Sequence, residues 1–92
     1  MAYNVLLGSG LRQIIKGNTI LTSGVADGGT GTSTDPYYKD VTISALTDIN
    51  KTVASVKGFS GSDLYGSLTS TTNIRLYYTN NTAAYYDIIE SY

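Results

Sequence analysis

The sequence predicts an all-β protein, specifically a small antiparallel β-sandwich of six or seven strands. Residue types that favour strands are abundant, because the chain has 13 Thr and 9 Tyr in addition to Val and Ile. Gly, Asn, Asp and Ser, which favour turns, separate short segments in which apolar and polar residues alternate. No segment has the 3.6-residue apolar period of an amphipathic helix.

The alternating segments give the expected strands in chain order. These are Leu11–Lys16, Thr19–Thr22, Tyr37–Leu46, Thr52–Phe59, Leu64–Thr69, Thr71–Tyr78 and Ala83–Glu90. We expect Gly17-Asn18 to bend the chain between the first two segments, and residues 47–51 to form a turn that Asp and Asn side chains can close. Gly66 interrupts a strand, which indicates a bulge or a close approach of another segment.

Residues 1–10 are predicted to be an N-terminal arm, and residues 11–92 a single domain. Gly8-Ser9-Gly10 has the composition of a flexible joint, and the preceding Tyr3, Val5 and Leu7 alternate as in a strand. The arm is either a frayed terminus or a strand that is added to a neighbouring chain. In the second case Tyr3, Val5, Leu6 and Leu7 would contact that neighbour.

Residues 23–36 form the longest segment without a strand pattern, and they contain four Gly and the only Pro. The Gly28-Gly29-Thr30-Gly31 part resembles the start of a calcium-binding repeat. That repeat requires an acidic residue where this chain has Ser33, and it occurs in tandem copies. Asp27 and Asp35 are too few for the six to eight oxygen ligands of calcium. We therefore expect a surface loop and no metal.

The composition excludes several classes of function. The chain has no Cys and no His, which excludes disulfides, the usual zinc and haem ligands, and Ser–His or Cys–His catalysis. We expect no enzymatic activity and no cofactor. The net charge of −1 does not indicate the basic surface that is typical of nucleic-acid binding. No apolar run is long enough to span a membrane. A 92-residue chain without disulfides has a thin core, so we expect it to form oligomers.

Tyrosines give the clearest indication of an interaction surface. They occur as adjacent pairs in three expected strands, at 37–38, 77–78 and 85–86. Neighbouring strand residues point to opposite faces, so each pair places one ring in the core and one outside. Outward tyrosines suit subunit packing or stacking against sugar rings, and subunit packing is favoured for a domain with so small a core.

The last two strands are expected to form a hairpin around Asn80-Asn81. A two-residue loop would pair Ile74 with Asp87 and mix apolar with charged residues on each face. A three-residue loop that includes Thr82 would pair Ile74 with Ile88, which gives one apolar face. We predict the three-residue loop. Its apolar, core-facing side contains Ile74, Leu76, Tyr86 and Ile88, and its opposite side contains Arg75, Tyr77, Tyr85, Asp87 and Ile89.

Several short motifs, taken in order, resemble a family of small bacteriophage virion domains. They are Ile14-Ile15-Lys16-Gly17, Val41-Thr42-Ile43-Ser44-Ala45-Leu46, Asp48-Ile49-Asn50-Lys51-Thr52-Val53, Leu68-Thr69-Ser70-Thr71-Thr72 and Asp87-Ile88-Ile89-Glu90. Domains of this family occur in tail fibres and as stand-alone structural proteins, and they look like the H-type lectin sandwich. The resemblance covers residues 11–90 and implies a trimeric antiparallel sandwich on a virion.

The chain departs from the family at Tyr85-Tyr86, where a Trp-type aromatic is common, at the 23–36 loop and at the arm. No sugar-binding residue of the family can be assigned to a position here. The resemblance therefore implies a bacteriophage structural protein of the virion, which we expect to be a homotrimeric decoration or cementing protein that attaches to major capsid or tail proteins. The alternative is a tail-fibre module that binds a host-surface glycan. The candidate interaction residues are Tyr3, Val5, Leu6, Leu7, Tyr77, Tyr85 and Ile89.

Overall fold

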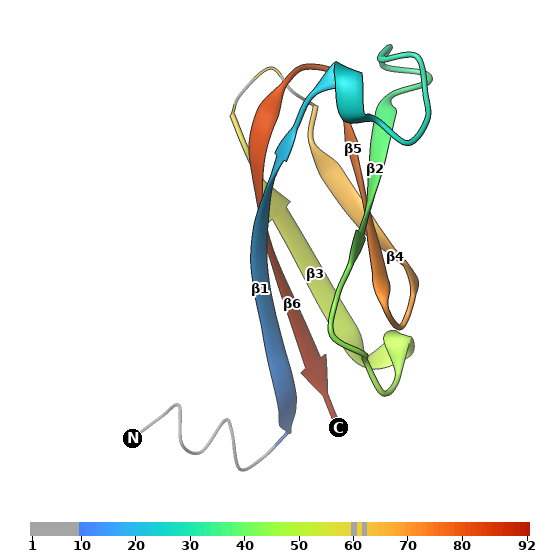
Figure 1. Cartoon of the computed structure of the whole chain (residues 1–92). Coiled ribbons are helices and arrows are strands. Elements are labelled where there is room, and N and C mark those ends of the chain that lie inside the picture. The colour runs from blue at the N-terminus through green and yellow to red at the C-terminus, as the bar shows by residue number, and fades with distance from the viewer. Residues whose placement is uncertain (1–9, 60, 62) are drawn as a thin grey trace.

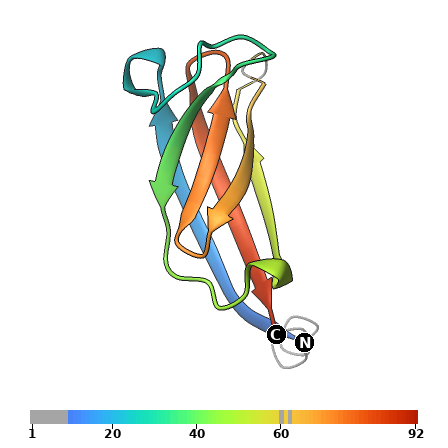
Figure 2. The same cartoon turned by 90° about the vertical axis from the view of Figure 1, so that its right-hand side faces the viewer.

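The protein is a sandwich of two antiparallel sheets with three strands each. The computed structural model describes residues 10–59, 61 and 63–92. The strands are β1 (Leu11–Leu21), β2 (Tyr37–Thr42), β3 (Thr52–Lys57), β4 (Tyr65–Ser70), β5 (Asn73–Tyr78) and β6 (Thr82–Ser91). One sheet has the order β1-β6-β3 and the other β2-β5-β4, and Figures 1 and 2 show them as two layers. The all-β prediction is confirmed.

The core lies between the sheets and contains alternate residues of β5 and β6. Ile74, Leu76 and Tyr78 face inward from β5, and Ala84, Tyr86 and Ile88 face inward from β6; all six are buried. The predicted core-facing residues Ile74, Leu76, Tyr86 and Ile88 are therefore confirmed. In each of the pairs 77–78 and 85–86, the second Tyr is buried and the first is more exposed, as the alternation predicted.

The predicted hairpin between the last two strands is wrong. β5 pairs with β2 and β4, whereas β6 pairs with β1 and β3, so Ile74 and Ile88 belong to different sheets. The connection at residues 79–81 crosses from one sheet to the other, and its Asn side chains bind neighbouring segments. Asn81 Oδ1 accepts a 3.0 Å hydrogen bond from Ser23 N, and Asn80 Nδ2 donates a 2.6 Å bond to Gly61 O.

β1 is one continuous strand, so the expected bend at Gly17-Asn18 is absent. Gly17 pairs with Tyr86, and a Cβ atom at position 17 would lie 2.2 Å from the Tyr86 hydroxyl. The glycine provides room for the tyrosine ring across the strand. Gly66 has a similar role in β4, because a Cβ there would lie 2.8 Å from Val56 Cγ2 of β3. The close approach considered for Gly66 is thus present, and the register irregularity in β4 lies between Leu68 and Ser70.

The strand expected over Tyr37–Leu46 ends at Thr42. Beyond it the chain leaves the sheet, because Ile43 N and Leu46 N donate to the carbonyl oxygens of Thr72 and Thr71, at 2.9 and 2.8 Å. Ile43 and Leu46 are buried in the core. The predicted turn at 47–51 contains a short 3-10 helix, Ile49–Lys51, in which the Asp48 side chain accepts a hydrogen bond from Asn50 N at 3.0 Å.

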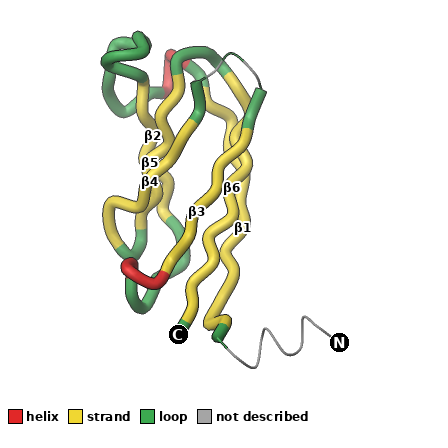
Figure 3. Tube along the Cα trace, turned by 180° about the vertical axis from the view of Figure 1, so that it is seen from behind, coloured by secondary structure: helices red, strands yellow, loops and turns green. Residues whose placement is uncertain are grey.

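Residues 23–36 are irregular except for the 3-10 turn at Ser23–Val25 and an isolated bridge between Gly28 and Tyr38. This connection lies at the end of the sandwich where β5 crosses to β6 (Figure 1). The start of β1 and the C-terminus lie at the other end, as Figure 3 also shows, and Tyr92 N donates a 2.8 Å hydrogen bond to Gly10 O.

Candidate functional site

The outer face of the β1-β6-β3 sheet carries a row of exposed apolar side chains. Ile14 of β1 and Val53 of β3 both pair with Ile89 of β6, so the three lie side by side across the sheet. Their exposed fractions are 50%, 70% and 44%. Ile20 and Tyr85, at 67% and 54%, extend the same face toward the loop end. We call these five residues the apolar face.

A polar row crosses the apolar face. Lys16 of β1 pairs with Asp87 of β6 through a 3.0 Å ion pair, in the row next to Ile14 and Ile89. Exposed side chains that form a contiguous apolar patch are typical of protein interfaces, whereas single ones are ordinary. Of this face, the row of Ile14, Ile89 and Val53 is contiguous, and the polar row of Lys16, Asp87 and Ser55 separates it from Tyr85 and Ile20.

The outer face of the β2-β5-β4 sheet instead carries a row of tyrosines. Tyr77 of β5 pairs with Tyr38 of β2 and Tyr65 of β4. The rings of Tyr65 and Tyr77 are stacked with centroids 4.6 Å apart, and those of Tyr38 and Tyr77 are tilted at 6.2 Å. Because the rings stack on one another, their free surface is reduced; Tyr65 at the sheet edge remains 52% exposed.

A polar network lies next to this tyrosine row. Arg75 donates from Nε and Nη2 to the two Asp40 oxygens at 2.8 and 3.1 Å, and its guanidinium carbon lies 4.2 Å from the centre of the Tyr38 ring. Asn73 Nδ2 donates a further 3.1 Å bond to Asp40. The hydrogen bond from Arg75 is the main reason that the pKa of Asp40 lies below its ordinary value, and the bond to Asp40 likewise raises the pKa of Arg75.

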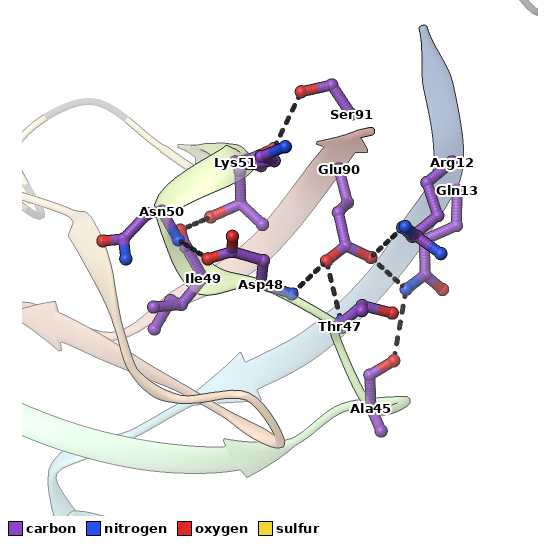
Figure 4. Close-up of polar contacts among 11 residues, drawn as sticks. Arg12, Gln13, Ala45, Thr47, Asp48, Ile49, Asn50, Lys51, Glu90 and Ser91 are labelled. Atoms are coloured by element: carbon purple, nitrogen blue, oxygen red, sulfur yellow. Dashed lines mark hydrogen bonds and ion pairs between the residues drawn. The ribbon is translucent and has the colours of Figure 1, made fainter.

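Glu90 is a buried carboxylate near the C-terminal end of β6, where polar groups of several segments surround it (Figure 4). Gln13 Nε2 donates to Oε1 at 2.7 Å, and the amides of Thr47 and Asp48 donate to Oε2 at 2.7 and 2.6 Å. Burial raises the pKa of Glu90, but these hydrogen bonds and the charge of Arg12 outweigh it, so the pKa lies below its ordinary value. With all its oxygens occupied, Glu90 holds β1, β6 and the β2–β3 connection together.

The predicted interaction residues do not form one surface. Tyr85 and Ile89 belong to the apolar face, whereas Tyr77 belongs to the tyrosine row on the opposite side of the sandwich. The predicted hairpin placed Tyr77 and Tyr85 on one side of the same strand pair; this is wrong, because their strands are in different sheets. The other candidates, Tyr3, Val5, Leu6 and Leu7, lie outside the described residues.

Sequence reasoning missed Ile14, Val53, Tyr38 and Tyr65 as surface residues. Their strands alternate, so one of the two faces could have been assigned to solvent from the pattern alone. The rows that they form could not be found in this way, because a row depends on which strands are neighbours. That information is carried by long-range pairing and not by local alternation.

The acidic residues of the 23–36 loop have structural partners. Asp35 O accepts hydrogen bonds from the amides of Thr30, Gly31 and Thr32, at 2.9–3.2 Å. Asp27 Oδ2 accepts a 2.7 Å bond from Asp40 N in β2. Within residues 10–59, 61 and 63–92, no group of three or more His, Cys, Asp or Glu could hold a metal ion. That part of the chain also contains no helix with the length and hydrophobicity needed to cross a membrane.

Comparison of the chain with models of protein families, with curated proteins and with solved structures found no match.

Proposed function

We propose that the protein is a non-enzymatic structural protein of a bacteriophage virion, a homotrimer that attaches to capsid or tail proteins as a decoration or cementing component. The virion assignment is based on the ordered motifs between Ile14 and Glu90. The apolar face is the observation that supports assembly. Complete burial of a fully exposed Val or Ile side chain contributes about 1.5–3 kcal/mol, and side chains that are 44–70% exposed retain roughly half of this gain. The row of Ile14, Ile89 and Val53 provides three such side chains in each copy.

Adhesion is the mechanism in this proposal. Each copy contributes a small contact area, and a trimer presents three identical surfaces to the particle at once. Linked copies bind more tightly than separate ones because the second and third contacts are intramolecular. The low content of charged residues, 14%, suits a protein whose surface is largely in contact with other proteins.

The test is the molar mass of the purified protein by light scattering coupled to size exclusion. We expect a trimer for the natural chain and mainly monomer for Ile89→Lys, which places a charge at the centre of the apolar row. Thr71→Lys is the matched control, because Thr71 is exposed in the β4–β5 turn, outside both sheets. A folded, monomeric natural chain at micromolar concentration would overturn the assembly proposal. Mass spectrometry of purified particles tests the virion assignment, which fails if the chain is absent.

Glycan binding is a second candidate, and the tyrosine row favours it. Tyr65 has the free ring surface that stacking against a sugar requires. A polar hollow of about 500 Å³ also lies near the loop end, between Ser23, Tyr37 and the Thr79–Asn81 connection. A glycan array distinguishes the two functions. Signal that is lost in Tyr65→Ala but kept in Tyr92→Ala, an exposed control, would favour glycan binding.

A further inference from the structure

We propose that the outer edge of β1 accepts a fourth strand, supplied by residues 3–7 of a second copy of this chain. The inference rests on the proposed self-association. β1 is the longest strand, with 11 residues, and among the described strands it pairs with β6 alone. The edge of such a strand presents main-chain donors and acceptors that can pair with another chain.

The other sheet edges are shorter and have neighbours. β2 is covered by the preceding loop, because Tyr38 exchanges hydrogen bonds with Asp27 N and Gly28 O at 2.7 and 3.0 Å. β3 and β4, with six residues each, adjoin one another where Gly66 packs against Val56. Figure 1 shows β1 (blue) along one side of the molecule, with its partner β6 on the inner side.

The charged side chains of β1 do not protect its free edge. Lysine and arginine on edge strands commonly prevent pairing with other chains. Here Lys16 is held by Asp87 of β6 at 3.0 Å. Arg12 is drawn toward the C-terminal end of β6, where its guanidinium carbon lies 4.3 Å from the centre of the Tyr92 ring and Nε lies 4.0 Å from Glu90. Both cations are thus oriented toward β6 and away from the open edge.

The arm has the sequence that this edge would accept. Residues 1–10 contain no charged side chain, and Tyr3, Val5 and Leu7 alternate. Added beside β1, these three side chains would continue the apolar face beyond Ile14 across a fourth strand. An arm folded back on its own β1 would have only Gly8, Ser9 and Gly10 as its loop, and would cover only the first residues of β1. A strand from a second copy has no such limit.

Cysteine cross-linking tests the proposal, since the natural chain has no Cys. Val5→Cys protein is refolded together with a differently tagged copy carrying Ile14→Cys or Asn18→Cys on β1. The controls are Val53→Cys and Lys57→Cys on β3, which occupy the same two rows at the other edge of the same sheet. A disulfide forms only when the two Cα atoms come within about 7 Å.

We expect disulfides between copies at the β1 positions in several-fold excess over those at β3. An absence of cross-links between copies, or equal yields at the two edges, overturns the inference. A double variant Val5→Cys/Ile14→Cys that closes only within one chain also overturns it, because the arm would then cover its own edge. The molar mass is measured on the same samples. A trimeric mass without β1 cross-links is consistent with the proposed function and overturns only the inference that the arm adds a strand to β1 of a second copy.

Discussion

Gln13 Nε2 donates a 2.7 Å hydrogen bond to Glu90 Oε1, which joins the first strand to the last. The same Gln13 nitrogen donates to Ala45 O at 3.1 Å. We predict that Glu90→Gln destabilises the fold, because an amide offers a single acceptor oxygen and its NH2 group would face a backbone donor or Gln13. Urea denaturation should show a lower free energy of unfolding.

The control for this prediction is Asp87→Asn on the same strand. Asp87 is half-exposed and pairs with Lys16 at the surface, and exposed ion pairs stabilise by less than about 1 kcal/mol. Glu90→Gln should therefore lower the free energy of unfolding more than Asp87→Asn does. Equal effects of the two substitutions would contradict the role given to Glu90.

Acid should destabilise the protein through Glu90 and Asp40. The pKa of each carboxyl group is lower in the folded state than its ordinary value, so the unfolded chain takes up protons more readily. Their stabilising contribution is complete above the unfolded-state pKa of about 4 and is lost as the pH falls through the lower folded-state pKa.

This prediction is tested by the free energy of unfolding in urea at pH 7, 5 and 3. We expect little change between pH 7 and 5 and a marked decrease at pH 3. The Glu90→Gln variant should show a smaller decrease, because one of the two groups no longer titrates. Constant stability of the natural chain down to pH 3 would be the contrary result.

Ile88→Ala should be among the most destabilising substitutions in the sandwich. Ile88 is fully buried between the sheets, and truncation of such a side chain leaves a cavity that costs about 2–5 kcal/mol. Calorimetry or urea denaturation measures the loss. Thr71→Ala in the exposed β4–β5 turn is the control and should change stability by less than about 0.5 kcal/mol. A loss for Ile88→Ala as small as this would contradict its core position.

Gly17→Ala should destabilise the protein because the new methyl group would overlap the Tyr86 ring. Overpacking of this kind costs about 1–3 kcal/mol. Gly24→Ala is the control, since a Cβ atom at that position meets nothing within 4 Å. Denaturation of both glycine variants, of Tyr86→Leu alone and of each glycine variant combined with Tyr86→Leu completes a double-mutant cycle.

The cycle separates the clash from the intrinsic effect of alanine in a strand. In the Tyr86→Leu background the cost of Gly17→Ala should fall, with a coupling energy of about 0.5–3 kcal/mol between contacting positions. Additive effects of the two substitutions would show that the ring does not constrain position 17.

Side-chain alternation made the inner and outer faces of single strands predictable. Ile74, Leu76, Tyr86 and Ile88 face the core as expected, although the pairing from which they were assigned is wrong. The assignment holds because burial selects the face of each strand separately, whichever strand lies beside it. A hairpin between the two strands and a connection that crosses between sheets therefore place the same residues in the core. For this reason the alternation within residues 74–88 could not distinguish the two arrangements.

Strand neighbours could not be predicted in the same way. Asn80-Asn81 is typical of a tight turn, but the hydrogen bonds of these side chains to Gly61 and Ser23 form only after distant segments have come together. The apolar face and the tyrosine row depend on those neighbours. Ile14 and Ile89 form one row because β1 and β6 pair, and no local pattern in the sequence specifies that pairing.

The pairing of β1 with β6 also sets the order of events during synthesis. Among the described strands, β1 and β3 each pair with β6, so both lack this partner while residues beyond 81 are still inside the ribosome. The β1-β6-β3 sheet cannot form until β6 has emerged, so half of the sandwich folds only after that strand is available. Contacts between such distant residues slow folding. During that interval the long edge of β1 and its Ile side chains are open to other nascent copies, so the polysome is where the proposed self-association would begin.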